Sequence, residues 1–221
     1  MVIGGRSQKQ TEIIDLTDSS VTCTSAFGEL ESRRWVPLGG LINETPLLCG
    51  GELGYEDGYD SCIVFGHPKT MIKLKEKRRS AFSVMLNETT FWIMGGYYSN
   101  TTEFITLGAT TSVYGPPLPK FMAAACAVKY NDTHIYVTDG SSVWIYNTVS
   151  SSWKEGPGMN VSRYGHGCTV LHYQQIPWLV VAASWNSGSG SKSVEILDPN
   201  MNKWIHGENN KKYHFSFRNT N

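Results

Sequence analysis

A short apolar run that ends in a pair of glycines recurs along this chain at nearly constant intervals. The pattern is intact at Gly4, Gly50 and Gly95, and worn versions stand at Asp139 and Ala182. These five positions are separated by steps of 46, 45, 44 and 43 residues. Periods of this length are typical of propellers, solenoids and other repeat arrays. The period therefore predicts one repeat domain over residues 1–221, in which each repeat buries its apolar face against its neighbours.

Each period divides into four short runs rich in β-branched and aromatic residues, separated by glycine, proline, asparagine or serine. We expect strands over 81–86, 91–96, 103–107 and 111–114, then 123–129, 134–140, 143–147 and 152–154, then 165–172, 177–183, 194–197 and 203–205. No stretch has a helical period. Four antiparallel strands in each period are the layout of a propeller blade. A glycine doublet at the end of the second strand suits a chain exit that needs positive φ.

Several features of these repeats together resemble the kelch family. They are the apolar run with its glycine doublet, a Gly-Pro pair before the next repeat (Gly115-Pro116, Gly156-Pro157), and a tryptophan after the third strand (Trp153, Trp204). Some positions depart from the pattern, at Asp139, Ala182, Ala183 and Tyr114. The resemblance covers essentially the whole chain. It implies an all-β, kelch-type β-propeller built of four-stranded antiparallel blades.

The repeats give blade boundaries and leave two architectures open. We expect blades near residues 1–34, 35–79, 80–120, 121–162 and 163–210, with 211–221 placed where a closing strand is due. If that last strand pairs with the first ones, the chain forms a five-bladed ring without exposed sheet edges. Because kelch propellers more usually have six or seven blades, the alternative is a fragment of a longer ring.

The charge balance argues against two classes of partner. Lysine plus arginine equals aspartate plus glutamate, at 19 each, so no basic excess favours nucleic acid or an anionic membrane. No apolar run approaches the roughly 18 residues that a membrane-spanning helix needs. We therefore expect neither nucleic-acid binding nor a membrane span.

Five cysteines leave at least one unpaired if the others bridge within the chain. Cys49 ends a second strand and Cys62 lies in the third strand of the same repeat, so neighbouring strands can bring them to disulfide distance. We favour this pair, and the alternative is two small buried hydrophobic residues. Cys126 and Cys168 lie in first strands of consecutive repeats and could meet, although such strands can lie too far apart. Cys23 has no evident partner.

Five Asn-x-Ser/Thr sequons are candidate glycosylation sites: Asn43, Asn87, Asn100, Asn131 and Asn160. Three of them, Asn43, Asn87 and Asn131, are each 44 residues apart, so the same loop of successive repeats carries the tripeptide. This arrangement favours an extracellular, secreted protein. The alternative is a turn that simply prefers asparagine followed by an acid, in a cytoplasmic protein.

An antiparallel blade sends its turns alternately to its two ends, which sorts the loops from sequence alone. The three periodic sequons fall at one end. The loops at the other end carry basic and aromatic candidate partner contacts: Arg33, Arg78, Lys120, Arg163, Tyr55, Tyr97, Tyr98 and Trp185. An acidic patch joins them, at Glu52, Glu56, Asp57 and Asp60. Arginine and large aromatic residues dominate binding hot spots. The alternative is solvated loop charges, or structural arginines that satisfy backbone carbonyls.

We therefore expect a non-catalytic protein-interaction module without cofactor, which binds an acidic or phosphorylated peptide, or a glycan, through that end. Glycans at Asn100 and Asn160, which lie at the same end, would conflict with such a site. The resemblance implies two alternatives: the substrate-recognition part of a BTB/cullin-type ubiquitin ligase adaptor, and actin or matrix binding.

A metal-dependent reading is weaker. Some kelch-like propellers are copper oxidases, and one first strand of this chain places four residues of suitable type on one side: Tyr164, His166, Cys168 and His172. No second ligand cluster accompanies them, so we expect no metal site and no enzyme activity.

Overall fold

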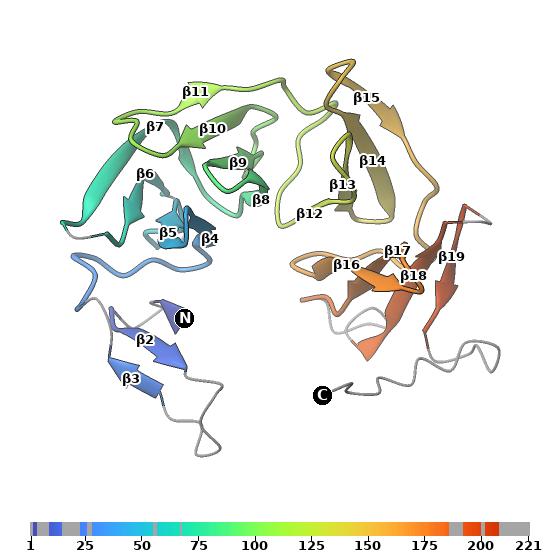
Figure 1. Cartoon of the computed structure of the whole chain (residues 1–221), viewed down its shortest axis with the longest axis horizontal. Coiled ribbons are helices and arrows are strands. Elements are labelled where there is room, and N and C mark those ends of the chain that lie inside the picture. The colour runs from blue at the N-terminus through green and yellow to red at the C-terminus, as the bar shows by residue number, and fades with distance from the viewer. Residues whose placement is uncertain are drawn as a thin grey trace. The chain divides into compact units, whose positions relative to one another are not determined.

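The computed structural model describes residues 2–3, 9–14, 23–25, 28–54, 57–66, 68–185, 192–199 and 202–207. These residues form antiparallel β-sheets and contain no α-helix, and each four-stranded sheet takes its strands in chain order (Figure 1). Accordingly, this part of the chain has no helix of the length and apolarity that a membrane crossing requires. The predicted all-β fold of four-stranded antiparallel, blade-like sheets is confirmed.

The chain divides into two compact units, residues 1–124 and 125–221. The first unit begins with a three-stranded sheet of β1 (Val2–Ile3), β2 (Thr11–Ile14) and β3 (Cys23–Ser25). The next sheet contains β4 (Leu38–Ile42), β5 (Thr45–Cys49), β6 (Tyr59–Val64) and β7 (Thr70–Arg78). The last sheet of this unit contains β8 (Phe82–Asn87), β9 (Thr90–Met94), β10 (Thr102–Thr106) and β11 (Val113–Tyr114).

The second unit holds two four-stranded sheets. One contains β12 (Cys126–Lys129), β13 (His134–Asp139), β14 (Ser142–Asn147) and β15 (Ser152–Glu155). The other contains β16 (Gly167–Tyr173), β17 (Ile176–Ala182), β18 (Val194–Asp198) and β19 (Lys203–His206). Sequence analysis expects one domain, whereas the contacts separate two units at the connection between β11 and β12. The expected closing strand, 211–221, lies outside the described residues.

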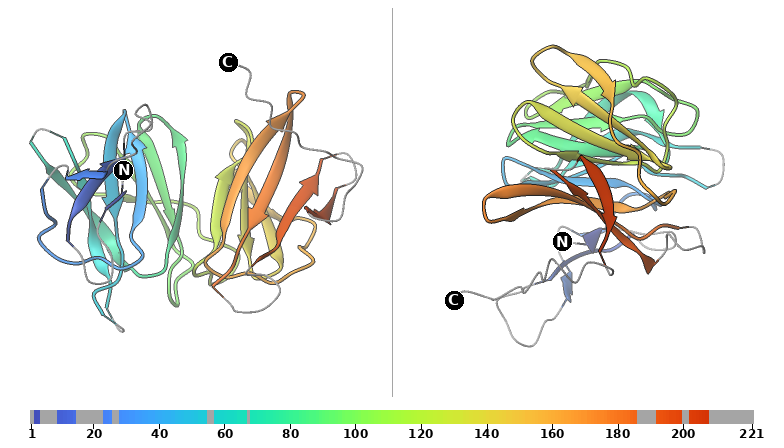
Figure 2. Two further views of the ribbon diagram at one scale, coloured as in Figure 1. Left: turned by 90° about the horizontal axis from the view of Figure 1, so that it is seen from below. Right: turned by 90° about the vertical axis from the view of Figure 1, so that its right-hand side faces the viewer.

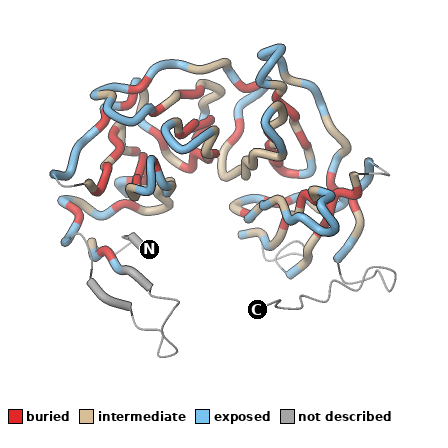
Figure 3. The backbone as a smooth tube through the Cα atoms, in the orientation of Figure 1, coloured by how far each residue is buried: buried red, intermediate tan, exposed pale blue. Residues whose placement is uncertain are grey.

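Burial explains why these runs form strands. All four residues Phe91–Met94 of β9 are buried, since β9 lies inside its sheet and is covered on both faces. The outer strand β7 instead alternates exposed and buried residues over most of its length, as a strand with one face in water does. Buried residues gather on strands such as β9 and β13, whereas β11 and β15 are largely exposed (Figure 3).

The hydrophobic core of each unit lies between neighbouring sheets. In the first unit, Leu47 and Ile72 of β4–β7 belong to one cluster with Phe91 and Ile105 of β8–β11. The second unit has an equivalent cluster, which contains Val143, Leu179, Leu197 and Trp204. Figure 2 shows the sheets of each unit from two further sides. Trp204, the tryptophan that follows the third strand, belongs to this second cluster, and its indole donates to the Pro157 carbonyl at 2.7 Å.

The exit from each second strand has a fixed geometry. Gly50 and Gly95 have φ of +57° and +59°, and a Cβ on Gly95 would lie 2.3 Å from the Met122 carbonyl oxygen. In the last repeat this position is Ala183, with φ of +64°, one residue later than Ala182 where the sequence pattern placed it. The end of this second strand is therefore not where the apolar run of the sequence stops. It is marked by the hydrogen bond from Ala183 N to Ser193 O, at 3.3 Å.

Two cysteine pairs lie at disulfide distance. Cys49 and Cys62 are directly opposite each other in β5 and β6, with Cα atoms 4.0 Å apart, so the structure is compatible with the pair that the sequence favours. The Cα atoms of Cys126 in β12 and Cys168 in β16 are 5.9 Å apart. These two first strands therefore lie close enough to be bridged, which the sequence left open. The side chain of Cys23 lies outside the described residues.

Candidate functional site

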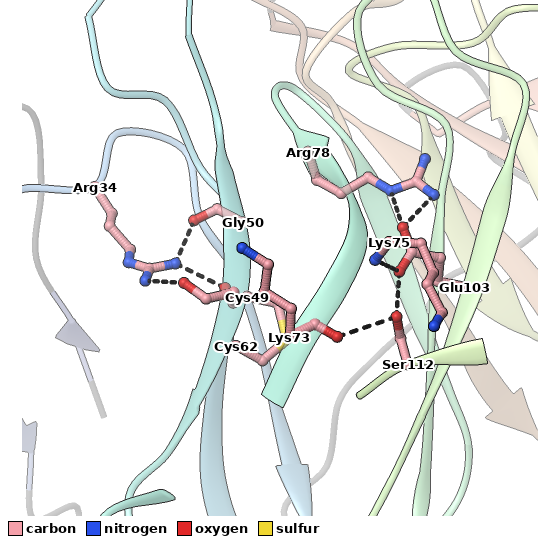
Figure 4. The surroundings of a disulfide bond; sticks show 10 residues. Arg34, Cys49, Gly50, Cys62, Lys73, Lys75, Arg78, Glu103 and Ser112 are labelled. Carbon is pink, nitrogen blue, oxygen red and sulfur yellow. Dashed lines mark hydrogen bonds and ion pairs between the residues drawn. A yellow bond between two sulfur atoms is a disulfide. The ribbon is translucent and has the colours of Figure 1, made fainter. Parts of the chain in front are cut away.

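Arg78, at the end of β7, has a side chain with no exposed surface. Its guanidinium donates to the Glu103 carboxylate of β10 at 2.6 and 3.0 Å (Figure 4). It also donates to the carbonyl oxygens of Gly95 and Thr101, at 2.9 and 3.1 Å. Glu103 is equally buried, so the two charges neutralise each other away from water. This arrangement fastens the end of β7 to β10, the third strand of the next sheet.

Arg163 repeats the arrangement in the second unit. Its side chain is also fully buried, and it pairs with buried Glu195 of β18 at 3.2 Å. The carbonyl oxygens of Ala183 and Ser193 accept from it at 3.0 and 2.9 Å. These acceptors correspond one for one to those of Arg78. We call each buried arginine–glutamate pair with its acceptors a clasp.

Each clasp carboxylate also accepts two backbone N–H groups of the entering segment. The donors lie three and two residues before the arginine: Lys75 and Glu76 (2.8 and 3.2 Å) for Glu103, and Asn160 and Val161 (2.8 and 3.2 Å) for Glu195. Ser112 adds a short hydrogen bond to Glu103. The buried carboxylates are thus surrounded by donors, as buried charges must be.

This corrects the placement of Arg78 and Arg163, which sequence analysis names as partner contacts. A side chain without exposed surface cannot meet a partner, and both guanidinium groups already bond several acceptors. They follow the alternative, in which structural arginines satisfy backbone carbonyls. The sequence locates the connections correctly but does not reveal whether a guanidinium points inward or outward.

The exposed part of the predicted surface in the first unit centres on Tyr97 and Tyr98, in the connection between β9 and β10. The two rings pack edge to face with centroids 4.7 Å apart, and the Arg79 guanidinium lies 4.2 Å from the centre of the Tyr97 ring. Tyr97 is 52% exposed and Tyr98 is 81% exposed. Tyr98 has φ of +60°, a costly conformation for a bulky residue. The connection therefore holds two large aromatic rings toward solvent.

Basic residues and a further aromatic ring lie at the same end of these sheets. Lys120 and Phe121 are exposed in the β11–β12 connection, which the hydrogen bond from Gly96 N to Met122 O, at 2.9 Å, holds against the tyrosine loop. Arg33 is exposed in the connection that enters β4. Tyr55, the remaining candidate in this unit, lies outside the described residues.

The second unit carries its own exposed aromatic pair. Trp185 is 59% exposed and Tyr164 is 44% exposed. The backbone N–H of Trp185 donates to the Tyr164 carbonyl at 2.8 Å, and the indole lies directly over Gly165. A Cβ at Gly165 would lie 2.1 Å from that ring, so the glycine is required for the contact.

The acidic patch is engaged in ion pairs within the chain. Lys77 pairs with Asp57 at 2.9 Å and Lys73 pairs with Asp60 at 2.5 Å, all four being at least partly exposed. Such surface pairs contribute little to stability. They do reduce the negative charge that this patch shows to solvent. Glu56 lies outside the described residues.

The five sequons fall into two groups, according to the end of the sheets at which they lie and the hydrogen bonds that the asparagine side chains make. Asn43, Asn87 and Asn131 are exposed in the hairpins that join first and second strands. The side-chain oxygens of Asn87 and Asn131 accept from the backbone N–H two residues on, each at 2.9 Å, so these asparagines also shape their turns. At the other end, the Asn160 Nδ2 group donates to the Trp204 carbonyl at 3.1 Å and that of Asn100 donates to the Leu118 carbonyl at 3.5 Å.

The residues considered for a metal site serve other roles. Cys168 lies at disulfide distance from Cys126, and His166 is buried, with Nε2 2.7 Å from the Thr138 hydroxyl. Burial, reinforced by the nearby Arg163 charge, lowers the pKa of His166 to about 4. His172 is exposed. Across the described ranges, no three histidine, cysteine, aspartate or glutamate side chains gather as metal ligands would.

Comparison with known proteins supports a relationship to kelch-repeat proteins. Human Kelch-like protein 23 is 29% identical over 128 residues, which cover 52% of this chain and 22% of that protein. Kelch-like protein 25 of human and of Xenopus tropicalis is 31% identical over 40% of this chain. The repeats of this chain are similar to kelch repeats. The predicted resemblance is confirmed, although no protein-family model matches the chain.

The match to these kelch-like proteins is partial. The chain spans about a fifth of the length of the curated relatives it matches. The kelch repeats account for the four-stranded sheets. They do not by themselves identify a partner.

The clasp generates a test by double substitution. Arg78→Met should lower the free energy of unfolding by about 3–5 kcal/mol, because it leaves the Glu103 charge buried and unpaired. Adding Glu103→Leu should cost much less than Glu103→Leu alone, since no lone charge then remains. Urea unfolding of the three variants measures this. Equal costs in both backgrounds would show that the pair is not coupled.

His166 generates a prediction about pH. Its folded pKa of about 4 lies below the ordinary value of 6.5, so the unfolded chain binds the proton more readily. Stability should therefore fall as pH drops from about 6.5 to 4, by at most about 1.4 kcal/mol per pH unit. Unfolding midpoints across this range, compared with those of His166→Gln, measure the effect. A pH profile unchanged by the substitution would contradict it.

Proposed function

We propose that this chain is a non-catalytic protein-interaction module that contacts its partner through the exposed aromatic and basic residues at one end of its sheets. The exposed Tyr97–Tyr98 pair, stacked on Arg79, is the observation that carries the proposal. Relationship to kelch-like proteins supports an interaction role.

The chemistry of these residues suits a contact surface. A tyrosine buries about 150–250 Å² when covered and has few side-chain torsions to restrict. Here the loop conformation already fixes both rings, so binding has less freedom to remove. The exposed basic residues Lys120 and Arg33, in connections at the same end of their sheets, favour a partner with acidic residues at the rim of the contact.

Alanine at both Tyr97 and Tyr98 tests the surface. We expect the double variant to weaken partner binding by at least about 2 kcal/mol, roughly 30-fold in Kd. The partner is first captured by crosslinking with the unaltered chain and identified by mass spectrometry, and binding is then titrated. Leu107→Ala, an exposed change in the β10–β11 turn at the opposite end of the same sheet, is the matched control. Equal binding by the two variants would remove the aromatic surface from the proposal.

We further propose that the protein is extracellular. Two cysteine pairs at disulfide distance support this, because such bonds persist in oxidising compartments. The exposed hairpin sequons of successive repeats give independent support. Peptide mapping of material secreted by eukaryotic cells, without reduction, should recover the Cys126–Cys168 linkage and glycans at Asn87 and Asn131. Because its amide is bonded within the fold, Asn160 should be unmodified. Reduced cysteines with bare hairpin asparagines would favour a cytoplasmic protein.

The second candidate is the substrate-recognition part of a ubiquitin ligase adaptor. It is favoured by the relatedness to kelch-like proteins that are several times longer than the matched stretch. Co-purification of the full-length protein with a cullin would support this function, and its absence from the cytoplasm would exclude it.

A further inference from the structure

A third buried arginine lacks the carboxylate that the other two hold. Arg34 donates to the carbonyl oxygens of Gly50 and Ser61, at 3.0 and 2.9 Å, as the clasp arginines do to the equivalent positions. In the strand pairing, Ile63 lies opposite Leu48 of the second strand. The clasp glutamates Glu103 and Glu195 lie opposite the equivalent residues of their own second strands, Ile93 and Val181. Ile63 thus occupies the position of the clasp glutamate. Arg34 instead donates to the Ser61 hydroxyl at 2.8 Å.

The donors that surround the carboxylate elsewhere remain in place. The backbone N–H groups of Glu31 and Ser32 lie three and two residues before Arg34, as the donors to Glu103 do before Arg78. Neither group donates to any described residue, and the same holds for Nε of Arg34. In both complete clasps, the arginine Nε bonds the glutamate. Within the described residues, three donors are therefore present without the acceptor that they share in the other sheets.

A pocket lies at this position. It has a volume of about 190 Å³ and is lined by Arg34, Ile63, Phe65, Lys69, Met71 and residues 29–32. A water molecule takes about 30 Å³ in the liquid, so the pocket has room for a carboxylate side chain. Arg34 is only 3% exposed, and burial lowers its pKa despite the opposing effects of Tyr59, Asp60 and Glu31. A buried cation that lacks a carboxylate favours an anion beside it.

Two glutamates of the chain itself line the pocket. Glu29 and Glu31 are exposed, and the Glu29 carboxylate accepts from the Gln10 amide at 3.4 Å. Lys69, in the connection between β6 and β7, also lines the pocket and offsets part of their negative charge. Exposed charges are screened by salt, whereas a buried guanidinium is screened much less. The local acids therefore do not replace the missing clasp carboxylate.

We propose that this pocket binds a carboxylate supplied by another molecule, the aspartate or glutamate side chain of a peptide. The bound carboxylate would accept the Glu31 and Ser32 N–H groups and the Arg34 Nε–H, which completes the clasp from outside. The proposal does not depend on the aromatic surface, whose residues are not among those that line the pocket.

A substitution that places a carboxylate beside Arg34 tests whether the three donors lack an acceptor. Ile63→Glu restores the residue found in the two complete clasps, and Ile63→Gln is the neutral control of equal size. At pH 7 we expect Ile63→Glu to have the higher thermal midpoint, at least equal to that of the unaltered chain. A midpoint for Ile63→Glu at or below that of Ile63→Gln would show that no unfilled donors await a carboxylate.

A ligand titration tests binding directly, without relying on the variants' stability. The probe is N-acetyl-glutamate N-methylamide, and its glutamine analogue is the control. We expect saturable NMR shifts of the Glu31 and Ser32 amides with the glutamate compound alone. Equal shifts with both compounds, or none with either, would overturn the proposal. So would matching shifts of these amides in the probe-free Glu29→Gln, Glu31→Gln double variant, because the chain's own acids would then occupy the site.

Discussion

The buried arginine–glutamate clasp is the interaction on which the connections between repeats depend. A propeller-type repeat must fasten the last strand of one sheet onto the next sheet, because the backbone ladder of one sheet does not continue into the next. Arg78 and Glu103 do this with side-chain hydrogen bonds to backbone carbonyl and N–H groups. Because both charges are removed from water, each is tolerated only while the other is present. The clasp thus makes the path of the connection dependent on two residues 25 positions apart.

The fourth repeat shows that the clasp is replaced as a whole. Met122 takes the position of Arg78, since its carbonyl accepts from Gly96 as that of Arg78 does from Gly51. Trp144, which pairs with Val137 as Glu103 pairs with Ile93, takes the position of the glutamate. Both charged partners are thus exchanged for apolar residues in one repeat. The second repeat is different, because Arg34 remains while only the glutamate is lost.

The sequence predicted the strands well because their signal is local. The apolar runs and the glycine doublets marked second strands such as β9 to within two residues, and antiparallel order then sorted the loops between the two ends. The site was harder to predict. Whether Arg78 faces inward and Tyr98 outward depends on partners far away in sequence, which periodicity does not register. The distance between Cys126 and Cys168 depends likewise on how two sheets pack.

The Cys126–Cys168 pair spans two sheets that also meet through side-chain packing and hydrogen bonds such as that between Tyr130 and Pro177. A covalent bond there would close residues 126–168, from β12 to the start of β16, into one loop of chain. A protease that cuts the exposed turn at Val149 would then release no fragment, because both pieces would stay tethered until a reductant opened the bridge. In a protease-rich surrounding, such nicked molecules would remain in one covalently linked piece.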